Sequence, residues 1–66
     1  MKSTIRTKPE GEWLMAYSPV GNVCHFTREF SEAKEFDMSY RPSAEWARKA
    51  LRVVREVYRR EDARIA

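Results

Sequence analysis

Apolar residues in the last third of the chain recur at the spacing of an α-helix. On a helical wheel of about 100° per residue they share one broad face, and Pro42 and Ser43 suit a first helical turn. The pattern predicts a long amphipathic helix over residues 43–64, whose apolar face must be buried against a second layer. The residues on this face are Trp46, Ala47, Ala50, Leu51, Val53, Val54, Val57, Tyr58 and Ile65.

Three segments in the first half of the chain carry the residue types of β-strands. EWLMAY (12–17) and NVCHFT (22–27) are rich in aromatic and β-branched residues, and the SPVG between them supplies turn residues. STIRTK (3–8) alternates polar and β-branched residues and ends at the turn-forming PEG. These segments predict a small antiparallel β-meander of two to three strands within residues 3–27.

The alternation of side chains along a strand predicts which face of the meander the long helix covers. In EWLMAY, Trp13, Met15 and Tyr17 share one face, and Leu14 and Ala16 share the other. The first face has the larger aromatic area. We therefore expect it to pack against the helix.

The segment FSEAKEF follows the meander and predicts a short helix over residues 31–37. Ser31 is a candidate N-cap, and Glu32 places negative charge in the first turn. The expected fold is α+β: the meander, this short helix, and the long C-terminal helix packed on the sheet. All of it is expected to form a single domain, residues 1–66.

The composition is that of a soluble globular domain. Hydrophobic residues make up 42% of the chain and charged residues 35%. The longest apolar run, residues 13–17, is far shorter than the about 20 residues of a bilayer-spanning helix, and residues 1–11 lack the apolar core of a signal peptide. Cys24 is the single cysteine, so no internal disulfide can form, and we expect it to be a buried core residue. These features predict a cytoplasmic protein.

Four arginines lie at spacings of four, three and four within the predicted long helix. This spacing places them in a line opposite the apolar face, where each like-charge pair costs about 0.2–0.5 kcal/mol. Glu45, Glu56 and Asp62 lie close enough to offset much of this cost. The four are Arg48, Arg52, Arg55 and Arg59.

The arginine line has three interpretations: a solvated helix face, a surface for carboxylates of a partner protein, and a surface for nucleic-acid phosphates. The net charge of +3 is weak for a dedicated nucleic-acid binder. The first helical turn, PSAEW, also lacks side chains that read bases. We therefore expect a small non-catalytic binding module, an accessory regulator or inhibitor that masks a charged surface of a larger protein. Nucleic-acid binding and a homodimer are the alternatives.

Two further groups of residues are candidates for contact with a partner. Tyr40 and Arg41, just before the long helix, and Tyr17, beside the hairpin turn, are expected to be exposed anchors, because Tyr and Arg are enriched at binding hot spots. A secondary acidic patch would oppose the basic helix and orient an encounter. Its members are Glu29, Glu32, Glu35 and Asp37.

The sequence predicts neither catalysis nor a bound cofactor. The single histidine, His25, follows Cys24 in a strand, so the two side chains point to opposite faces and cannot readily share a metal ion. No nucleophile with a neighbouring base, no glycine-rich phosphate loop and no metal-ligand spacing is visible.

Overall fold

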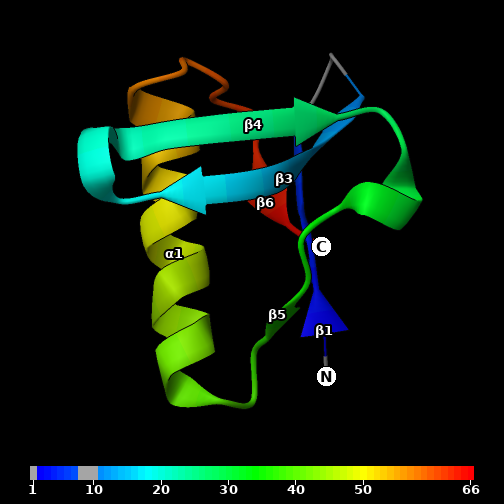
Figure 1. Cartoon of the computed structure of the whole chain (residues 1–66), viewed down its shortest axis with the longest axis vertical. Helices are drawn as coiled ribbons and strands as arrows, with labels where there is room; N and C mark the ends of the chain where they lie inside the picture. Colours follow the sequence, from blue (N-terminus) through cyan, green and yellow to red (C-terminus); the bar gives the residue numbers. More distant parts are fainter. Residues whose placement is uncertain (1, 8–10) are drawn as a thin grey trace.

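The computed structural model describes residues 2–7 and 11–66, and it has the expected α+β architecture (Figure 1). A four-stranded antiparallel sheet has the strand order β4-β3-β2-β6, and a separate two-stranded sheet pairs β1 with β5. One helix, α1, packs against the strands. The elements are β1 (Lys2–Ser3), β2 (Ile5–Thr7), β3 (Glu12–Ser18), the 3-10 turn η1 (Val20–Asn22), β4 (Val23–Thr27), the 3-10 turn η2 (Phe30–Glu32), β5 (Phe36–Asp37), α1 (Arg41–Glu56) and β6 (Arg64–Ile65).

The predicted meander is present as β2, β3 and β4. Between β3 and β4 the chain turns through Gly21, with φ 76°, and Asn22, with φ 53°. Glycine and asparagine tolerate this left-handed conformation better than other residues, so the SPVGN segment closes the hairpin. The end of the predicted first strand at Lys8 and the PEG turn at Pro9 and Glu10 lie outside the described residues.

The predicted core face of β3, with Trp13, Met15 and Tyr17, is correct only for Tyr17, because the strand contains a β-bulge and Leu14 is the other buried residue. Leu14 pairs with Phe26 but Ala16 pairs with His25, so the register shifts between Leu14 and Ala16. An extra residue in one strand reverses the alternation beyond it. As a result Leu14 and Tyr17 are both buried, at 0% and 8% exposure.

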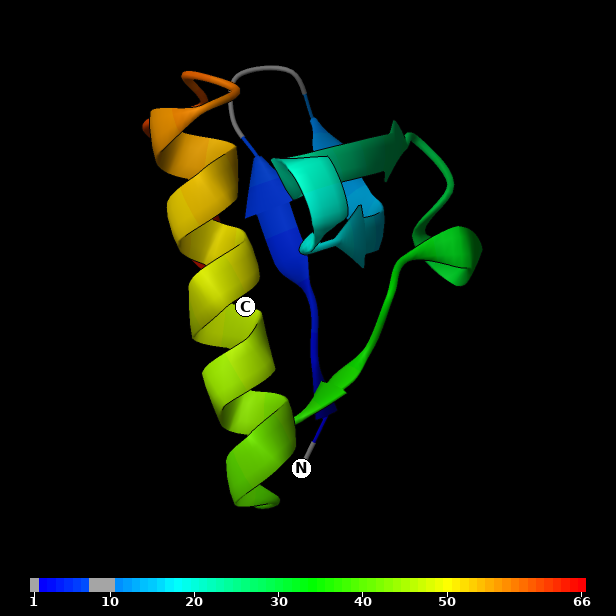
Figure 2. The same ribbon diagram turned by 60° about the vertical axis from the view of Figure 1, so that its left-hand side comes forward.

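The helix α1 covers this face with mostly small side chains. Ala44, Ala47, Ala50, Val53 and Val54 are buried along it. Alanines allow the helix backbone to approach the sheet closely, and Figure 2 shows α1 lying along one side of the strands. On the strand side, the core consists of Ile5, Leu14, Tyr17, Cys24 and Phe36, with Ala63 from the C-terminal segment.

The short helix predicted over residues 31–37 is not formed. A single 3-10 turn spans Phe30–Glu32, and the chain is already extended at Ala33, with φ −66° and ψ 138°. Phe36–Asp37 then pairs with Lys2–Ser3 as a strand, and Phe36 is buried in the core. Isolated helices this short are marginal, so strand pairing and the burial of Phe36 outweigh the capping signal at Ser31.

The long helix is shorter than the predicted 43–64. It begins at Arg41, where Tyr40 is the N-cap, and ends at Glu56. Arg59 has φ 60°, which turns the chain away from the helix axis. The following residues return to the sheet, where Ile65 pairs with Ile5 as part of β6. Ile65 therefore reaches the core from a strand and not from the helix.

Within the described residues, no helix is both long and apolar enough to cross a membrane.

Candidate functional site

The face of α1 that points away from the sheet carries most of the predicted site. Its side chains are exposed and lie opposite the buried alanines and valines, as expected from the helical period. Five of them are cationic and two are carboxylates. The members are Arg41, Glu45, Arg48, Lys49, Arg52, Arg55 and Glu56.

Three neighbouring cations on this face form no ion pair or hydrogen bond with any described residue. They are Arg48, Lys49 and Arg52, and with Glu45 they line a shallow hollow of about 270 Å³. We call these three residues the basic helix face. Glu45 instead pairs with Arg41, whose Nε lies 3.1 Å from a Glu45 carboxylate oxygen, and both side chains are largely exposed.

The other two arginines of the predicted line are placed differently. The Nε of Arg55 donates a hydrogen bond to the Ala63 carbonyl oxygen at 2.8 Å, so Arg55 ties the end of α1 to the segment before β6. Arg59 lies beyond the helix, in the turn with positive φ. The line of four arginines is therefore reduced to the N-terminal pair, Arg48 and Arg52, joined by Lys49.

The predicted aromatic anchors have opposite environments. Tyr40 is 60% exposed at the start of α1, next to the exposed Arg41. Tyr17 is buried, so the prediction that it is exposed is wrong. The bulge in β3 turns it into the core, where its ring packs edge-on against Trp46 with centroids 5.4 Å apart.

The predicted acidic residues lie in and around η2 and β5, and two of them have local structural roles. Glu32 accepts a hydrogen bond from the Thr27 hydroxyl at 2.8 Å. Asp37 accepts hydrogen bonds from the Ser39 hydroxyl at 2.6 Å and the Ser39 N–H at 3.1 Å, which lower the pKa of its carboxyl. Glu29 and Glu35 are exposed.

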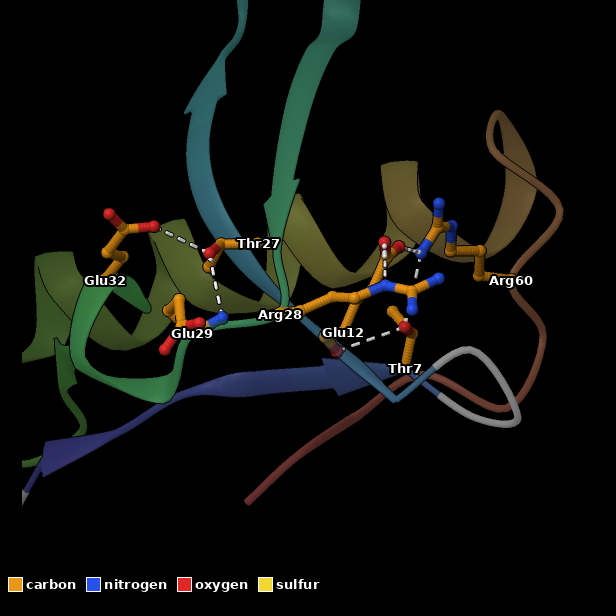
Figure 3. Close-up of polar contacts among 7 residues, drawn as sticks. All are labelled: Thr7, Glu12, Thr27, Arg28, Glu29, Glu32 and Arg60. Carbon is orange, nitrogen blue, oxygen red and sulfur yellow. Dashed lines mark hydrogen bonds and ion pairs between the residues drawn. The ribbon is translucent and has the colours of Figure 1, made fainter.

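An ion pair that the sequence did not indicate joins Glu12 to Arg60 (Figure 3). An Nη of Arg60 lies 2.5 Å from a Glu12 carboxylate oxygen, and the guanidinium stacks 3.8 Å from the centre of the Phe26 ring. The hydrogen bond from Arg60 lowers the pKa of Glu12, with a smaller contribution from Arg28. No sequence pattern links Glu12 and Arg60, because 48 positions separate them.

A second hollow, of about 340 Å³, was also missed. It lies on the sheet face away from α1 and is lined by both cations and aromatic rings. Its lining residues are up to 64 positions apart in the sequence. Its lining residues are Lys2, Thr4, Arg6, Trp13, Phe30, Glu35 and Ala66.

The residues capable of metal or nucleophilic chemistry do not converge. Cys24 is buried as expected, and burial raises the pKa of its thiol, which opposes formation of the reactive thiolate. His25 is exposed on the neighbouring position of β4. In the described part of the chain, no three His, Cys, Asp or Glu residues lie close enough together to hold a metal ion.

No protein-family model, no curated protein and no solved structure matches the chain.

Proposed function

We propose that this chain is a small non-catalytic binding module, an accessory regulator or inhibitor in the cytoplasm that masks an acidic surface of a larger protein. The observation that supports the proposal is the basic helix face. Arg48, Lys49 and Arg52 are exposed, lie side by side on one rigid helix, and have no anionic partner among the described residues.

The geometry of the helix suits a docking element. From Arg41 to Arg52 the exposed face extends about 16 Å at 1.5 Å per residue, which is a substantial part of one standard protein interface. The opposite face of α1 is fixed against the sheet by its buried alanines and valines, so little ordering is required on binding. Arginine can also bind a carboxylate through two parallel hydrogen bonds.

Carboxylates are a better match than a nucleic-acid backbone for this particular face. Glu45 and Glu56 lie among the cations, and Glu45 already engages Arg41. Two negative charges within the face would repel a continuous line of phosphates. A protein surface can instead place basic groups opposite Glu45 and Glu56, which gives orientation as well as attraction.

The proposal can be tested with two model ligands and a pair of matched variants. We would measure the binding of a labelled poly-glutamate peptide and of duplex DNA by fluorescence anisotropy at two salt concentrations. The test variant is Arg48→Ser/Arg52→Ser. The control variant is Arg6→Ser/Arg64→Ser, which removes the same charge from the sheet face.

We expect poly-glutamate binding to weaken as the salt concentration rises. In the helix variant the affinity should fall about tenfold or more, which corresponds to a loss of about 1.4 kcal/mol or more of binding free energy. The affinity of the control variant should not change. Equal loss in both variants would reduce the effect to net charge and contradict the proposal. Tighter binding to duplex DNA, lost only in the helix variant, would favour the nucleic-acid alternative. Sedimentation velocity on the same samples would detect a homodimer.

A physiological partner can be sought with the same two variants. Crosslinking of the wild-type chain in a cell extract, followed by mass spectrometry, should identify a protein whose capture the helix variant loses and the control retains. The crosslinks should involve Lys49. A crosslinked partner surface without an excess of Asp and Glu would contradict the proposal.

A further inference from the structure

The sheet face away from α1 carries a row of large side chains from three adjacent strands. Arg64 in β6 lies opposite Arg6 in β2, and Arg6 lies opposite Trp13 in β3. The neighbouring residues Ile5 and Ile65 point toward the core, so the alternation of the strands directs this row to the other face. This face is independent of the basic helix face.

Two aromatic rings form one side of the hollow on this face. The rings of Trp13 and Phe30 meet edge to face, with centroids 5.3 Å apart and an interplanar angle of 67°. Phe30 is 59% exposed, whereas most aromatic residues of this chain are buried or partly buried. An exposed ring beside a hollow is a surface on which a flat group can stack.

The turn that carries Phe30 is held by a local hydrogen-bond network. The Thr27 hydroxyl donates to Glu32 at 2.8 Å and accepts from the Glu29 N–H at 3.0 Å (Figure 3). The Lys34 N–H donates to the Leu14 carbonyl oxygen at 2.9 Å, which fixes the turn to β3. Phe30 is therefore exposed on a pre-organised turn, and binding through it requires little ordering.

The cations around the hollow are not neutralised by direct ion pairs, although Glu35 also lines the hollow. Lys2, Arg6 and Arg64 are exposed and form no ion pair with a described residue. The guanidinium of Arg6 lies 5.7 Å from the centre of the Trp13 ring. Like charges directly opposite each other on neighbouring strands destabilise a sheet, so the Arg6–Arg64 pair has no benefit for folding. Such a pair is consistent with binding of an anion.

We propose that this face binds single-stranded nucleic acid. A base stacks on Phe30 beside Trp13, and the adjoining phosphates contact Arg6, Arg64 and Lys2. Stacking rings next to cations are the combination used for single strands, where base faces are accessible, whereas a duplex hides those faces. Glu35, at the edge of the hollow, can accept a hydrogen bond from a base amino group while it repels phosphates, which would place the backbone on the Arg64 side.

The test measures binding of labelled oligothymidylate and oligouridylate by fluorescence anisotropy over a series of salt concentrations. Three phosphate contacts predict a slope of log K against log salt of about −2 for the single strand. Arg6→Ser/Arg64→Ser should reduce the slope to about −0.7. Phe30→Ala should weaken binding about 5- to 150-fold, whereas Phe30→Tyr, which retains the ring, should bind like the wild type.

A direct readout of stacking comes from tryptophan fluorescence. Trp13 and Trp46 are the two tryptophans, and Trp46 packs against Tyr17 on the opposite side of the sheet. In a Trp46→Phe background, which circular dichroism should first show to be folded, the remaining Trp13 fluorescence should be quenched by oligothymidylate. An abasic oligonucleotide of the same length should quench it less and bind more weakly.

Several results would overturn the inference. They are absence of single-strand binding at low salt, equal binding of the abasic strand, and binding unaffected by Phe30→Ala. Loss of binding in Arg48→Ser/Arg52→Ser but not in Arg6→Ser/Arg64→Ser would assign the nucleic acid to the helix. If the chain binds poly-glutamate more tightly than oligothymidylate, and Phe30→Ala weakens the poly-glutamate binding, the ligand of this face would be an acidic peptide. Failure of single-strand binding would not bear on the proposed docking function of α1, because that function is tested separately by poly-glutamate binding to Arg48→Ser/Arg52→Ser.

Discussion

Tyr17 and Tyr58 place the same hydroxyl group in different surroundings. The Tyr58 oxygen accepts a hydrogen bond from the Cys24 N–H at 2.8 Å, on the edge strand β4. This contact caps one backbone group that the edge would otherwise expose. The Tyr17 hydroxyl is buried and has no hydrogen-bond partner among the described residues. Burying a polar group without a partner destabilises the folded state, so the two tyrosines should respond in opposite directions to loss of the hydroxyl.

We expect Tyr17→Phe to raise the free energy of unfolding by up to about 1 kcal/mol, because it removes an unsatisfied buried group without changing the ring. Tyr58→Phe should lower it by about 1 kcal/mol, because the Cys24 N–H loses its acceptor. Urea unfolding followed by circular dichroism measures both. Destabilisation by Tyr17→Phe would mean that its hydroxyl has a partner in solution.

Glu12 should make the folded state sensitive to acid. Arg60 lowers its pKa in the folded protein below the ordinary value of 4.5, so at pH below about 4.5 the unfolded state binds more protons than the folded state. The stabilisation by the ion pair is thus complete above the unfolded pKa and is lost as the pH falls through the folded pKa. Asp37, whose pKa is also lowered, contributes in the same direction.

The Glu12 contribution can be measured as the pH dependence of urea unfolding between about pH 6 and 3. Glu12→Gln should lower the stability at pH 6 by about 1–2 kcal/mol and should flatten the decrease toward pH 3, leaving the part due to Asp37. Glu61→Gln, at an exposed site, should behave like the wild type. An unchanged pH profile in Glu12→Gln would show that the ion pair with Arg60 does not form in solution.

The C-terminal end of α1 shows how an element boundary depends on distant contacts. The apolar period continues through Val57 and Tyr58, yet Val57 is 56% exposed and the helix has already ended. The Arg60 N–H turns back to the Val54 carbonyl oxygen at 3.1 Å, and this reversal requires the left-handed conformation of Arg59. Arginine is an unfavourable residue for positive φ, so the contacts of Arg60 with Glu12 and Phe26 must compensate.

We expect Arg59→Gly to stabilise the fold by about 1 kcal/mol, since glycine adopts positive φ without a Cβ clash. Arg59→Ala is the matched control: it removes the same charge but keeps the Cβ, and should leave stability near that of the wild type. Thermal melts of the three proteins provide the comparison. A gain in Arg59→Ala equal to that in Arg59→Gly would attribute the effect to charge and not to the backbone.

Strands from the N-terminal and C-terminal segments pair with each other in the four-stranded sheet. β2 lies between β3 and β6, and Thr4 exchanges two backbone hydrogen bonds with Ala66, at 3.0 and 2.8 Å. Ala63 is buried at 1% exposure and accepts the hydrogen bond from Arg55. In a chain of 66 residues the net stability is expected to be only about 3–10 kcal/mol, so these few C-terminal residues account for a considerable part of it.

Truncation after Asp62 removes Ala63 and β6 and should lower the free energy of unfolding by about 2–4 kcal/mol, through lost apolar burial and strand pairing. Arg64→Ala keeps the strand and changes only an exposed side chain, so it should stay folded with stability close to the wild type. Circular dichroism melts would show a large decrease in melting temperature for the truncation alone. A truncated chain as stable as the full chain would show that β6 is not part of the cooperative fold.

Local patterns in the sequence were sufficient for the α+β class, the hairpin, the burial of Cys24 and the existence of an amphipathic helix with Arg48 and Arg52 on its exposed side. Each of these depends on residues a few positions apart, where helix and strand periods act directly. The exposure of Tyr40 and Arg41, at the N-terminal end of the helix, also follows from local position.

The remaining features arise from contacts between residues far apart in the chain. The bulge that buries Tyr17, the strand formed by Phe36–Asp37 in place of a short helix, and the end of α1 at Glu56 all depend on pairing or packing with distant segments. The same is true of the hollow that brings Arg6, Trp13 and Phe30 together. The helix and strand propensities of these short segments differ by roughly a few tenths of a kcal/mol. One long-range strand pairing or buried side chain contributes more free energy than this, so tertiary contacts override the local propensities.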